Sequence, residues 1–217
     1  YFCSKIIDMN ILESLRTRYA VKKFDSTKYL PEEKLNIIKV TFNLTPTSYG
    51  LQPLKMLVIR DKELQKELQT YSYNQQMVGA ASDVLVFCAI EKIDEAYIKE
   101  YFEREKAVRG TDEETVKPFR DFLISDFGSK TQEQIHNWAV NQIYIALGNL
   151  MTVCAAEEID ACPVEGFVPS EYDKILNLKE KGLKSVLVMP IGYRADDDVF
   201  ATFDKVRKPL EDSVFEF

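Results

Sequence analysis

The sequence predicts an α+β fold, in which helices pack on a small sheet. Three apolar runs have the length of strands, and they occupy residues 54–60, 83–91 and 184–193. Segments with helical periodicity separate these runs. The run at 83–91 is apolar throughout, as in a strand that is covered on both faces. No internal repeat, low-complexity tract or linker divides the chain, so we expect a single domain over residues 9–217.

The composition narrows the class of protein. With 28 Lys and Arg against 35 Asp and Glu, the formal net charge is −7, which argues against a nucleic-acid-binding protein. The four cysteines form no C-x-x-C pair, and this predicts a reduced, intracellular protein. Residues 1–8 carry charge and no cleavage site, so we expect no signal peptide and a cytoplasmic location. Because they precede Met9, we interpret them as an upstream extension or a tag.

The first third of the chain begins with two helices and a loop. Asn10 with Glu13 three residues later is a capping-box pattern, and it predicts a short amphipathic helix that ends near Tyr19. Pro31 predicts the start of a second helix, because proline suits the first helical turn. Two prolines and a glycine predict a loop at residues 45–53.

The middle of the chain is predominantly helical after its first strand. Asp61 predicts the cap of an amphipathic helix, and the charged and aromatic stretch at 94–128 predicts further helical pieces. Thr131 with Gln134 is a second capping box, which opens the longest helix, ending near Ile159.

That longest helix is apolar on every side between residues 139 and 156. A helix on the surface of a monomer keeps a polar face, so this one must be covered all round. We expect it at the centre of a homodimer, and the alternative is the central helix of a monomer. Asn141, Gln142 and Asn149 argue against a membrane span.

The last third predicts one more strand between irregular segments. Residues 160–167 predict a short extended segment, and Pro169 predicts a helix through Leu178. The strand at 184–193 follows. Residues 194–217 alternate charge with Phe and Val, which predicts an extended tail of the kind that wraps a partner subunit.

Several common active sites are absent from the sequence. His136 is the single histidine, so the chain has no His-rich metal site, and no G-x-S-x-G elbow accompanies it. The eight glycines never occur as G-x-G, so the dinucleotide fingerprint and the phosphate loop are missing. We therefore expect no metal, and any bound phosphate must be held by side-chain cations.

Two basic clusters supply such cations in an otherwise acidic chain, and they are Arg18/Lys22/Lys23 and Lys205/Arg207/Lys208. If both line one site, they neutralise a dianionic phosphate with charge to spare. Each cluster taken alone is better explained as a solvated charge run. In the segment 163–167, Gly166 beside Glu165 permits the backbone to approach a flat ligand closely.

These pieces, in this order, resemble the nitroreductase family of flavoproteins, and most closely its bacterial oxygen-insensitive NAD(P)H nitroreductases. The segments are RYAVKKFD (18–25), TPTSYGLQP (45–53), YNQQM (73–77), PVEGF (163–167) and KVRKP (205–209). The likeness extends over essentially the whole chain from Met9 to Phe217. It rests on the combination, order and spacing of the segments.

The resemblance implies an α+β nitroreductase-like fold with a central mixed or antiparallel sheet flanked by helices. It implies a homodimer with the long helix at its centre and a C-terminal tail that extends onto the partner subunit. It also implies tightly bound FMN, at two sites in the dimer interface, and NAD(P)H as electron donor. Small molecules are the expected substrates, and neither a nucleic acid nor a membrane is an expected partner.

Carried over by position, the resemblance implies that Arg18, Lys205 and Arg207 hold the FMN phosphate. Lys22 would face the pyrimidine edge of the flavin. A backbone N–H from the turn at 165–166 would reach N5, where the chemistry occurs without a catalytic side chain. The full set of implied FMN contacts is Arg18, Tyr19, Ala20, Lys22, Pro46, Thr47, Ser48, Gly50, Asn74, Pro163, Val164, Glu165, Gly166, Lys205 and Arg207.

Part of this implied site comes from elsewhere in the dimer. Pro46, Thr47 and Ser48 would be contributed by the other subunit. The implied NAD(P)H and substrate pocket is shaped by Lys22, Tyr49, Asn74, Leu123 and Ile124.

The sequence departs from the family pattern at four positions. Leu54 stands where many relatives have Trp, and Gly50 aligns with a flavin-contacting Asn. Met77 replaces a Lys, and Ala20 replaces a hydroxyl residue. The changes at Gly50, Met77 and Ala20 remove polar contacts, and they bear on FMN affinity, potential and substrate range.

Three functions are consistent with these patterns. The first is an FMN-dependent NAD(P)H oxidoreductase that reduces nitroaromatics, quinones or similar flat acceptors by ping-pong hydride transfer through flavin N5. The second is a specialised flavin, quinone or dihydropteridine reductase. The third is a flavin-binding regulatory protein with little turnover.

Overall fold

A four-stranded antiparallel sheet forms the centre of the molecule in the computed structural model, which describes residues 11–217. The strands are β1 (Leu54–Ile59), β2 (Asp83–Ile90), β3 (Asp160–Ala161) and β4 (Leu183–Gly192), in the spatial order β1-β2-β4-β3. The predicted α+β class is confirmed, with an antiparallel sheet. The expected capping residue Asn10 and the expected extension at 1–8 lie outside the described residues.

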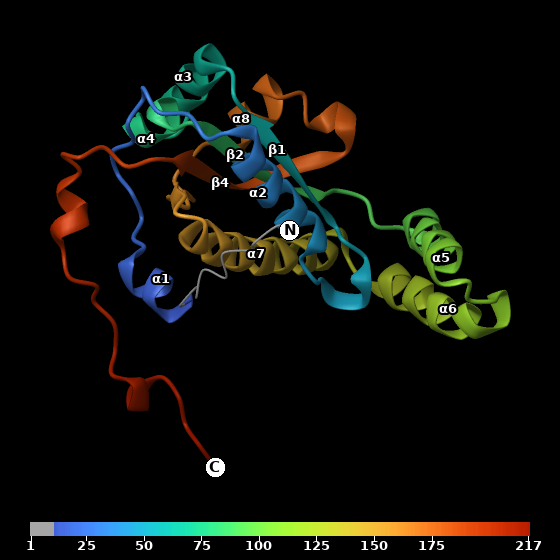
Figure 1. The fold of residues 1–217 in the computed structure, drawn as a ribbon. Helices are drawn as coiled ribbons and strands as arrows, with labels where there is room; N and C mark the ends of the chain where they lie inside the picture. The colour runs from blue at the N-terminus through green and yellow to red at the C-terminus, as the bar shows by residue number, and fades with distance from the viewer. Residues whose placement is uncertain (1–10) are drawn as a thin grey trace, which may run out of the picture.

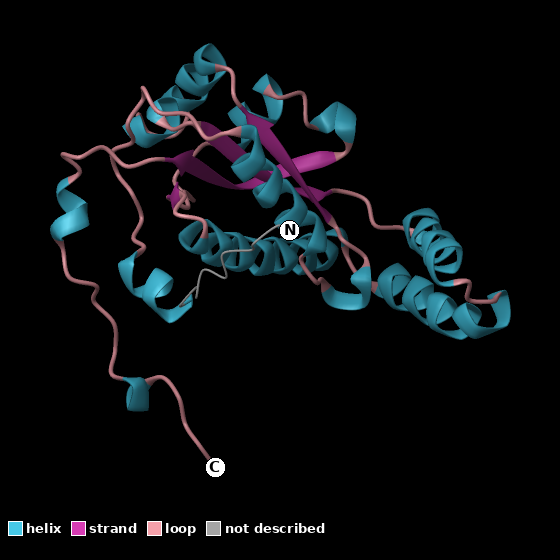
Figure 2. Ribbon diagram, viewed as in Figure 1, coloured by secondary structure: helices cyan, strands magenta, loops and turns pink. Residues whose placement is uncertain are grey.

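Eight α-helices are seen among residues 11–217, and most of them cover the two faces of the sheet (Figures 1 and 2). They are α1 (Ile11–Thr17), α2 (Glu32–Leu44), α3 (Lys62–Thr70), α4 (Gln76–Ala80), α5 (Glu95–Arg109), α6 (Glu113–Ser129), α7 (Gln132–Ala156) and α8 (Pro169–Ile175). The helices α2 and α7 pack on one face, and α3, α4 and α8 lie on the other. The pair α5 and α6 projects from one side of this body (Figure 1).

The central strand β2 explains why two layers of helices are needed. Its side chains alternate between two apolar clusters, because successive residues of a strand point to opposite faces. Leu85 and Phe87 join the cluster with α7, whereas Val84 and Val86 join the cluster with α3 and α8, and all four are fully buried. The sequence prediction of a strand covered on both faces is confirmed.

The ends of several helices are set by side-chain caps that the sequence predicted. The Asp61 carboxylate accepts a hydrogen bond from the backbone N–H of Leu64 at 2.9 Å. At the start of α7, Gln134 N donates to Thr131 Oγ1 and Thr131 N donates to Gln134 Oε1, which is a complete capping box. Such reciprocal bonds satisfy donors that a helix start otherwise leaves unpaired.

Three predicted boundaries differ from the structure. Helix α7 ends at Ala156 rather than near Ile159, because Glu158 adopts a left-handed φ of 54° that turns the chain into β3. Helix α8 ends at Ile175, before the predicted Leu178. The strand β3 was expected only as an extended segment, since two residues give no readable periodicity.

Helix α7 is not buried all round within one chain. Tyr144 and Ile145 are 41% and 47% exposed, whereas the opposite side of the helix is buried against the sheet. By length and composition α7 could cross a membrane, but the core helix of a folded α+β body passes the same test. Its buried residues, such as Ile143 and Leu150, lie in the sheet-facing cluster.

The C-terminal segment leaves the body after β4 and runs away from it (Figure 1). It is extended apart from two short 3₁₀ turns, Val199–Thr202 and Leu210–Asp212. The predicted extended tail is confirmed. Its apolar side chains are exposed, among them Phe203 at 63%, Val206 at 87% and Phe215 at 72%.

Gly192, the last residue of β4, allows two segments to approach closely. A Cβ at this position would lie 2.9 Å from the backbone N of Ser82 and 3.2 Å from the ring of Phe24. We expect Gly192→Ala to lower the free energy of unfolding by about 1–3 kcal/mol, because the backbone must shift to relieve the overlap. Urea denaturation measures this change.

Gly128 provides the matched control for that substitution. It lies inside α6, and a Cβ there meets nothing within 4 Å. Gly128→Ala should stabilise the protein by about 0.5–1 kcal/mol, because alanine loses less backbone entropy in a helix. Equal effects of the two substitutions would contradict the close approach at Gly192.

Candidate functional site

The two basic clusters of the sequence meet at one cavity of about 670 Å³. Lys205 Nζ donates a hydrogen bond to the backbone carbonyl of Arg18. The residues that line the cavity are Arg16, Thr17, Arg18, Tyr19, Ala20, Lys22, Arg194, Phe200, Ala201, Phe203, Asp204, Lys205 and Arg207. Six of the predicted FMN contacts therefore come together from two distant segments, and they are Arg18, Tyr19, Ala20, Lys22, Lys205 and Arg207.

Four of the cations that line this cavity differ from Arg16 and Arg194 in lacking an ion pair with a carboxylate of residues 11–217. Among residues 11–217, none of Arg18, Lys22, Lys205 and Arg207 forms an ion pair. Burial and then the charge of Arg207 lower the pKa of Arg18. Burial and then the charges of Arg18 and Arg207 lower the pKa of Lys205. The like charges thus repel one another, and an anion in the cavity would relieve that repulsion.

Arg194 also lines the cavity, and the sequence analysis did not find it. Its guanidinium donates two hydrogen bonds to Asp160, one from Nε at 2.9 Å, and its backbone N–H donates a third at 2.7 Å. The guanidinium carbon lies 4.6 Å from the ring centre of Tyr19. Because its charge is already paired with Asp160, Arg194 packs on the ring of Tyr19 and fixes the position of that side chain. A lone Arg after a strand carries no signal that predicts this role.

Lys22 extends from the cavity toward the segment 160–167. Its Nζ lies 3.4 Å from Sγ of the fully buried Cys162. The two backbone segments that carry Lys22 and Cys162 also lie side by side, since Ala20 forms a β-bridge with Ala161. This contact places the first basic cluster beside the start of the predicted turn at 163–166.

The turn at 163–166 is tied to the loop that carries Asn74. Gln75 Nε2 donates to the carbonyl oxygens of Gly166 at 2.7 Å and of Ser72 at 2.9 Å. Tyr73 and Asn74 both adopt left-handed backbone angles, with φ of 53° and 57°. Such strain in non-glycine residues is concentrated at functional sites. The loop that carries Asn74 is therefore fastened to the turn through Gln75, and the role of Asn74 itself stays a prediction.

Glu165 links this turn to the exposed face of α7. The hydroxyl of Tyr144 donates a hydrogen bond to Glu165 Oε1. This bond, with burial and the charge of the carboxylate, raises the pKa of Tyr144 to about 12. The turn and the exposed side of the long helix therefore form one continuous surface.

The loop at 45–53 lies elsewhere on the molecule. Ser48 N donates to Gln142 Oε1 at 2.8 Å, in the first half of α7, whereas Arg18 lines a small cavity together with Cys154, near the end of that helix. The rise of a helix separates those two points of α7 by about 18 Å. Within one chain, Pro46, Thr47 and Ser48 are thus not at the cationic cavity.

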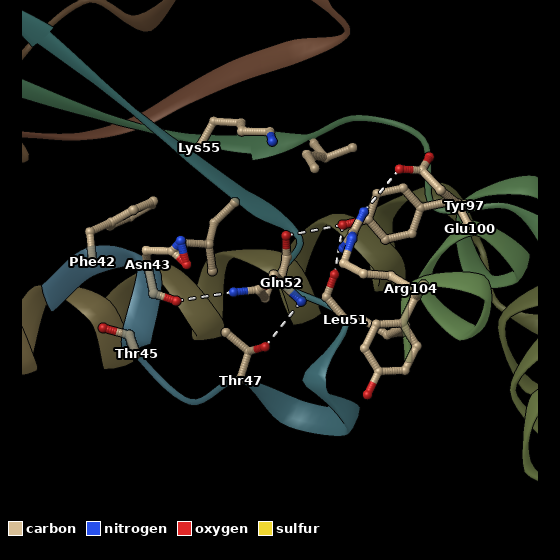
Figure 3. A pocket seen from close by; sticks show the side chains of 13 residues that line it. Phe42, Asn43, Thr45, Thr47, Leu51, Gln52, Lys55, Tyr97, Glu100 and Arg104 are labelled. Atoms are coloured by element: carbon tan, nitrogen blue, oxygen red, sulfur yellow. Dashed lines mark hydrogen bonds and ion pairs between the residues drawn. The ribbon is translucent and has the colours of Figure 1, made fainter. Parts of the chain in front are cut away.

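A second cavity, of about 380 Å³, lies on the other side of this loop (Figure 3). The hydroxyl of Tyr97 donates to the carbonyls of Leu51 at 2.7 Å and Gln52 at 3.0 Å. Gln52 has a φ of 49°, and its backbone N–H donates to Thr47 Oγ1 at 3.0 Å. These hydrogen bonds, two of them from α5, hold the loop in its strained backbone conformation.

The residues that were predicted to line the substrate pocket differ in how far they are buried. Tyr49 is 41% exposed and stacks on Trp138, with ring centres 6.3 Å apart. Leu123 is fully buried in the apolar core of α6, while the neighbouring Ile124 is half-buried. The structure therefore assigns Leu123 to packing, and the pocket role of Ile124 and Tyr49 stays a prediction.

The chain resembles known proteins in family, sequence and fold. A model described as the nitroreductase family matches residues 15–193. An oxygen-insensitive NAD(P)H nitroreductase from Salmonella typhimurium is 31% identical over 216 residues, which cover 96% of this chain and 100% of that protein. A protein of the same description from Enterobacter cloacae is 30% identical over 221 residues, with coverage of 96% and 100%.

Solved structures show the same fold at lower sequence identity. A nitroreductase family protein from Streptococcus pneumoniae has a TM-score of 0.78 and 20% identity, and the match covers 95% of this chain and 99% of that one. A protein from Exiguobacterium sibiricum, solved in complex with FMN, has a TM-score of 0.79 and 19% identity, with coverage of 96% and 97%.

The unpaired cations predict that the cavity binds a simple anion. We expect inorganic phosphate to raise the unfolding temperature of protein stripped of small molecules, because a ligand of the folded state stabilises it. Lys205→Gln should reduce that rise by at least half. Lys208→Gln is the matched control, since Lys208 is exposed and does not line the cavity. An unchanged rise in Lys205→Gln, measured by calorimetry, would contradict the assignment.

Proposed function

We propose, from the premise that the chain belongs to the nitroreductase family, that it binds FMN in the cationic cavity and passes electrons from NAD(P)H to flat organic acceptors. Membership makes the chain an oxidoreductase of the NAD(P)H nitroreductase type. FMN bound there would supply the redox chemistry for a ping-pong hydride transfer from NAD(P)H to the acceptor through N5, and residues of this chain would hold it in place.

The observation that carries the proposal is the meeting of Arg18, Lys205 and Arg207, none of which forms an ion pair with a carboxylate of residues 11–217. A phosphate monoester carries a charge of about −2 at neutral pH and offers three strong acceptor oxygens. The volume of about 670 Å³ lies within the range of small-molecule sites. The residues present therefore fit a mononucleotide.

The charge at the cavity also suits the reduced cofactor. The four unpaired cations and Asp204 give the site a net charge of about +3. A phosphate dianion leaves about one positive charge over. Lys22, the cation nearest to the turn at 163–166, would hold that charge beside the flavin ring and favour its anionic, reduced form.

The remaining chain residues orient and enclose the ring. The turn at 163–166 would bring backbone N–H groups to the flavin, and Gln75 fixes the position of this turn. Exposed aromatic side chains beside the loop at 45–53 suit flat acceptors such as nitroaromatics or quinones, and they would reach the cavity from a partner chain. Phe119 and Phe122 are 45% and 53% exposed and stack at 6.2 Å, and Tyr49 meets Phe119 at 6.1 Å.

We further propose that the active form is a homodimer. The exposed side of α7 carries Tyr144 and Ile145, which a second copy would cover. The loop at 46–48 lies too far from the cationic cavity to join it within one chain, but it could join the cavity of a partner. The exposed apolar tail is a further surface for that partner.

A first experiment tests cofactor and turnover together. The purified protein should be yellow and release FMN on denaturation, and rapid mixing with NADH or NADPH without oxygen should bleach the flavin band. Bound FMN without bleaching would instead favour a flavin-binding regulatory protein. A colourless protein that takes up no added FMN would contradict the proposed function.

Arg18→Ala tests the phosphate contact. We expect it to weaken FMN binding roughly ten- to hundredfold, because a hydrogen bond to a charged group contributes about 1.5–3 kcal/mol. Quenching of flavin fluorescence on titration measures the dissociation constant. Arg104→Ala is the control, because Arg104 pairs with Glu100 at the second cavity, and it should leave FMN binding unchanged.

Ile145→Asp tests the dimer. A charge in the middle of an apolar interface is left without a partner, so we expect the variant to elute as a monomer in light-scattering chromatography and to lose FMN. Val108→Asp places the same charge on an apolar residue that is 78% exposed on α5, and it should leave the mass unchanged. A dimeric Ile145→Asp variant would argue against α7 as the interface.

A further inference from the structure

We propose that Asp198 is the positioning residue that brings the two walls of the cationic cavity together. The first wall is the segment with Arg18 and Lys22, and the second is the tail segment with Lys205 and Arg207. This inference rests on the proposed binding of FMN. Asp198 lies in the segment between β4 and the tail, and only 4% of its surface is exposed. Neither the sequence analysis nor the lining of the cavity includes it.

One oxygen of Asp198 holds the first wall. Its Oδ2 accepts hydrogen bonds from Lys22 N at 3.0 Å, Lys23 N at 3.3 Å and the Tyr19 hydroxyl at 2.9 Å. Three donors from residues 19–23 therefore point at a single atom. This fixes the backbone that presents Arg18 and Lys22 to the cavity.

The other oxygen holds the second wall. Asp198 Oδ1 accepts from Phe200 N at 3.2 Å, and this bond caps the 3₁₀ turn Val199–Thr202. The backbone N–H of Asp198 donates to the carbonyl of Ala195 at 3.1 Å. The direction in which the tail leaves the body, and thus the place of Lys205 and Arg207, is set at this turn.

The hydrogen bonds to Asp198 favour its ionised form, and the ionised form links the two walls more strongly than a neutral side chain would. Burial opposes ionisation of Asp198, but hydrogen bonds from Lys22 N, the Tyr19 hydroxyl, Phe200 N and Lys23 N outweigh it and lower the pKa. The two walls carry like charges that repel each other. A charged acceptor that binds donors from both walls is the strongest link of this kind, since bonds to ionised groups are about twice as strong as neutral ones.

The neighbouring Asp197 offers a matched control of equal charge. Its side chain is 71% exposed and pairs with Lys23 Nζ at the surface. Loss of either carboxylate makes the region more positive by one charge. On charge alone, both substitutions should leave FMN binding unchanged or tighten it. A positioning role for Asp198 predicts the opposite sign for that residue only.

The test compares Asp198→Asn, Asp197→Asn and the wild type in titrations with FMN and with riboflavin, which lacks the phosphate. We expect Asp198→Asn to weaken FMN binding at least tenfold and to weaken riboflavin binding far less, so that the preference for FMN falls. Asp197→Asn should remain within twofold of the wild type for both ligands.

Each result decides the matter. FMN binding by Asp198→Asn that equals or exceeds that of the wild type would overturn the inference, and so would an equal loss of FMN and riboflavin, which indicates general damage to the fold. A wild type that binds neither flavin would overturn the proposed function itself. If Asp198→Asn does not fold, Tyr19→Phe removes one donor to Oδ2, and an unchanged preference for FMN in that variant would overturn the inference.

Discussion

The structure depends on holding like charges together where the segment after α1 meets the start of the C-terminal tail. The charge of Arg207 lowers the pKa of both Arg18 and Lys205, and no acid among the described residues pairs with any of the three. Folding alone gains nothing from such an arrangement, because repulsion and burial both oppose it. A bound anion would offset that repulsion, which is the physical reason for the proposed phosphate site.

The sheet supplies the rigid support for that arrangement. Short bridges extend it at one end, where Ala20 pairs with Ala161 and Phe24 pairs with Arg194. The backbone N–H of Ala195 donates to the carbonyl of Lys23 at 2.9 Å. The segment after α1 is thus clamped between β3 and the end of β4. The C-terminal tail begins directly after β4, beside the segment that carries Arg18 and Lys22. The fold therefore places Lys205 and Arg207 close to the first basic cluster.

The sequence allowed the frame to be predicted better than the site. Local signals sufficed for the frame: the cap residue Asp61, the capping box at Thr131, and the unbroken apolar run of β2 act over a few residues. The meeting of the two basic clusters could only be a hypothesis, because each looks like a solvated charge run. Arg194 and Asp198 gave no signal at all, since their roles come from partners that lie far away in sequence.

A second copy of the chain would explain three features that a single chain does not account for. The exposed residues of α7, the loop at 46–48 about 18 Å along that helix, and the apolar side chains of the tail share no contact that buries them together. A twofold axis at α7 repeats each feature on the opposite side. The Tyr144–Glu165 hydrogen bond already joins the helix to the turn at 163–166. An interface along α7 would therefore also border the proposed flavin site, and it would couple the proposed assembly to the proposed cofactor binding.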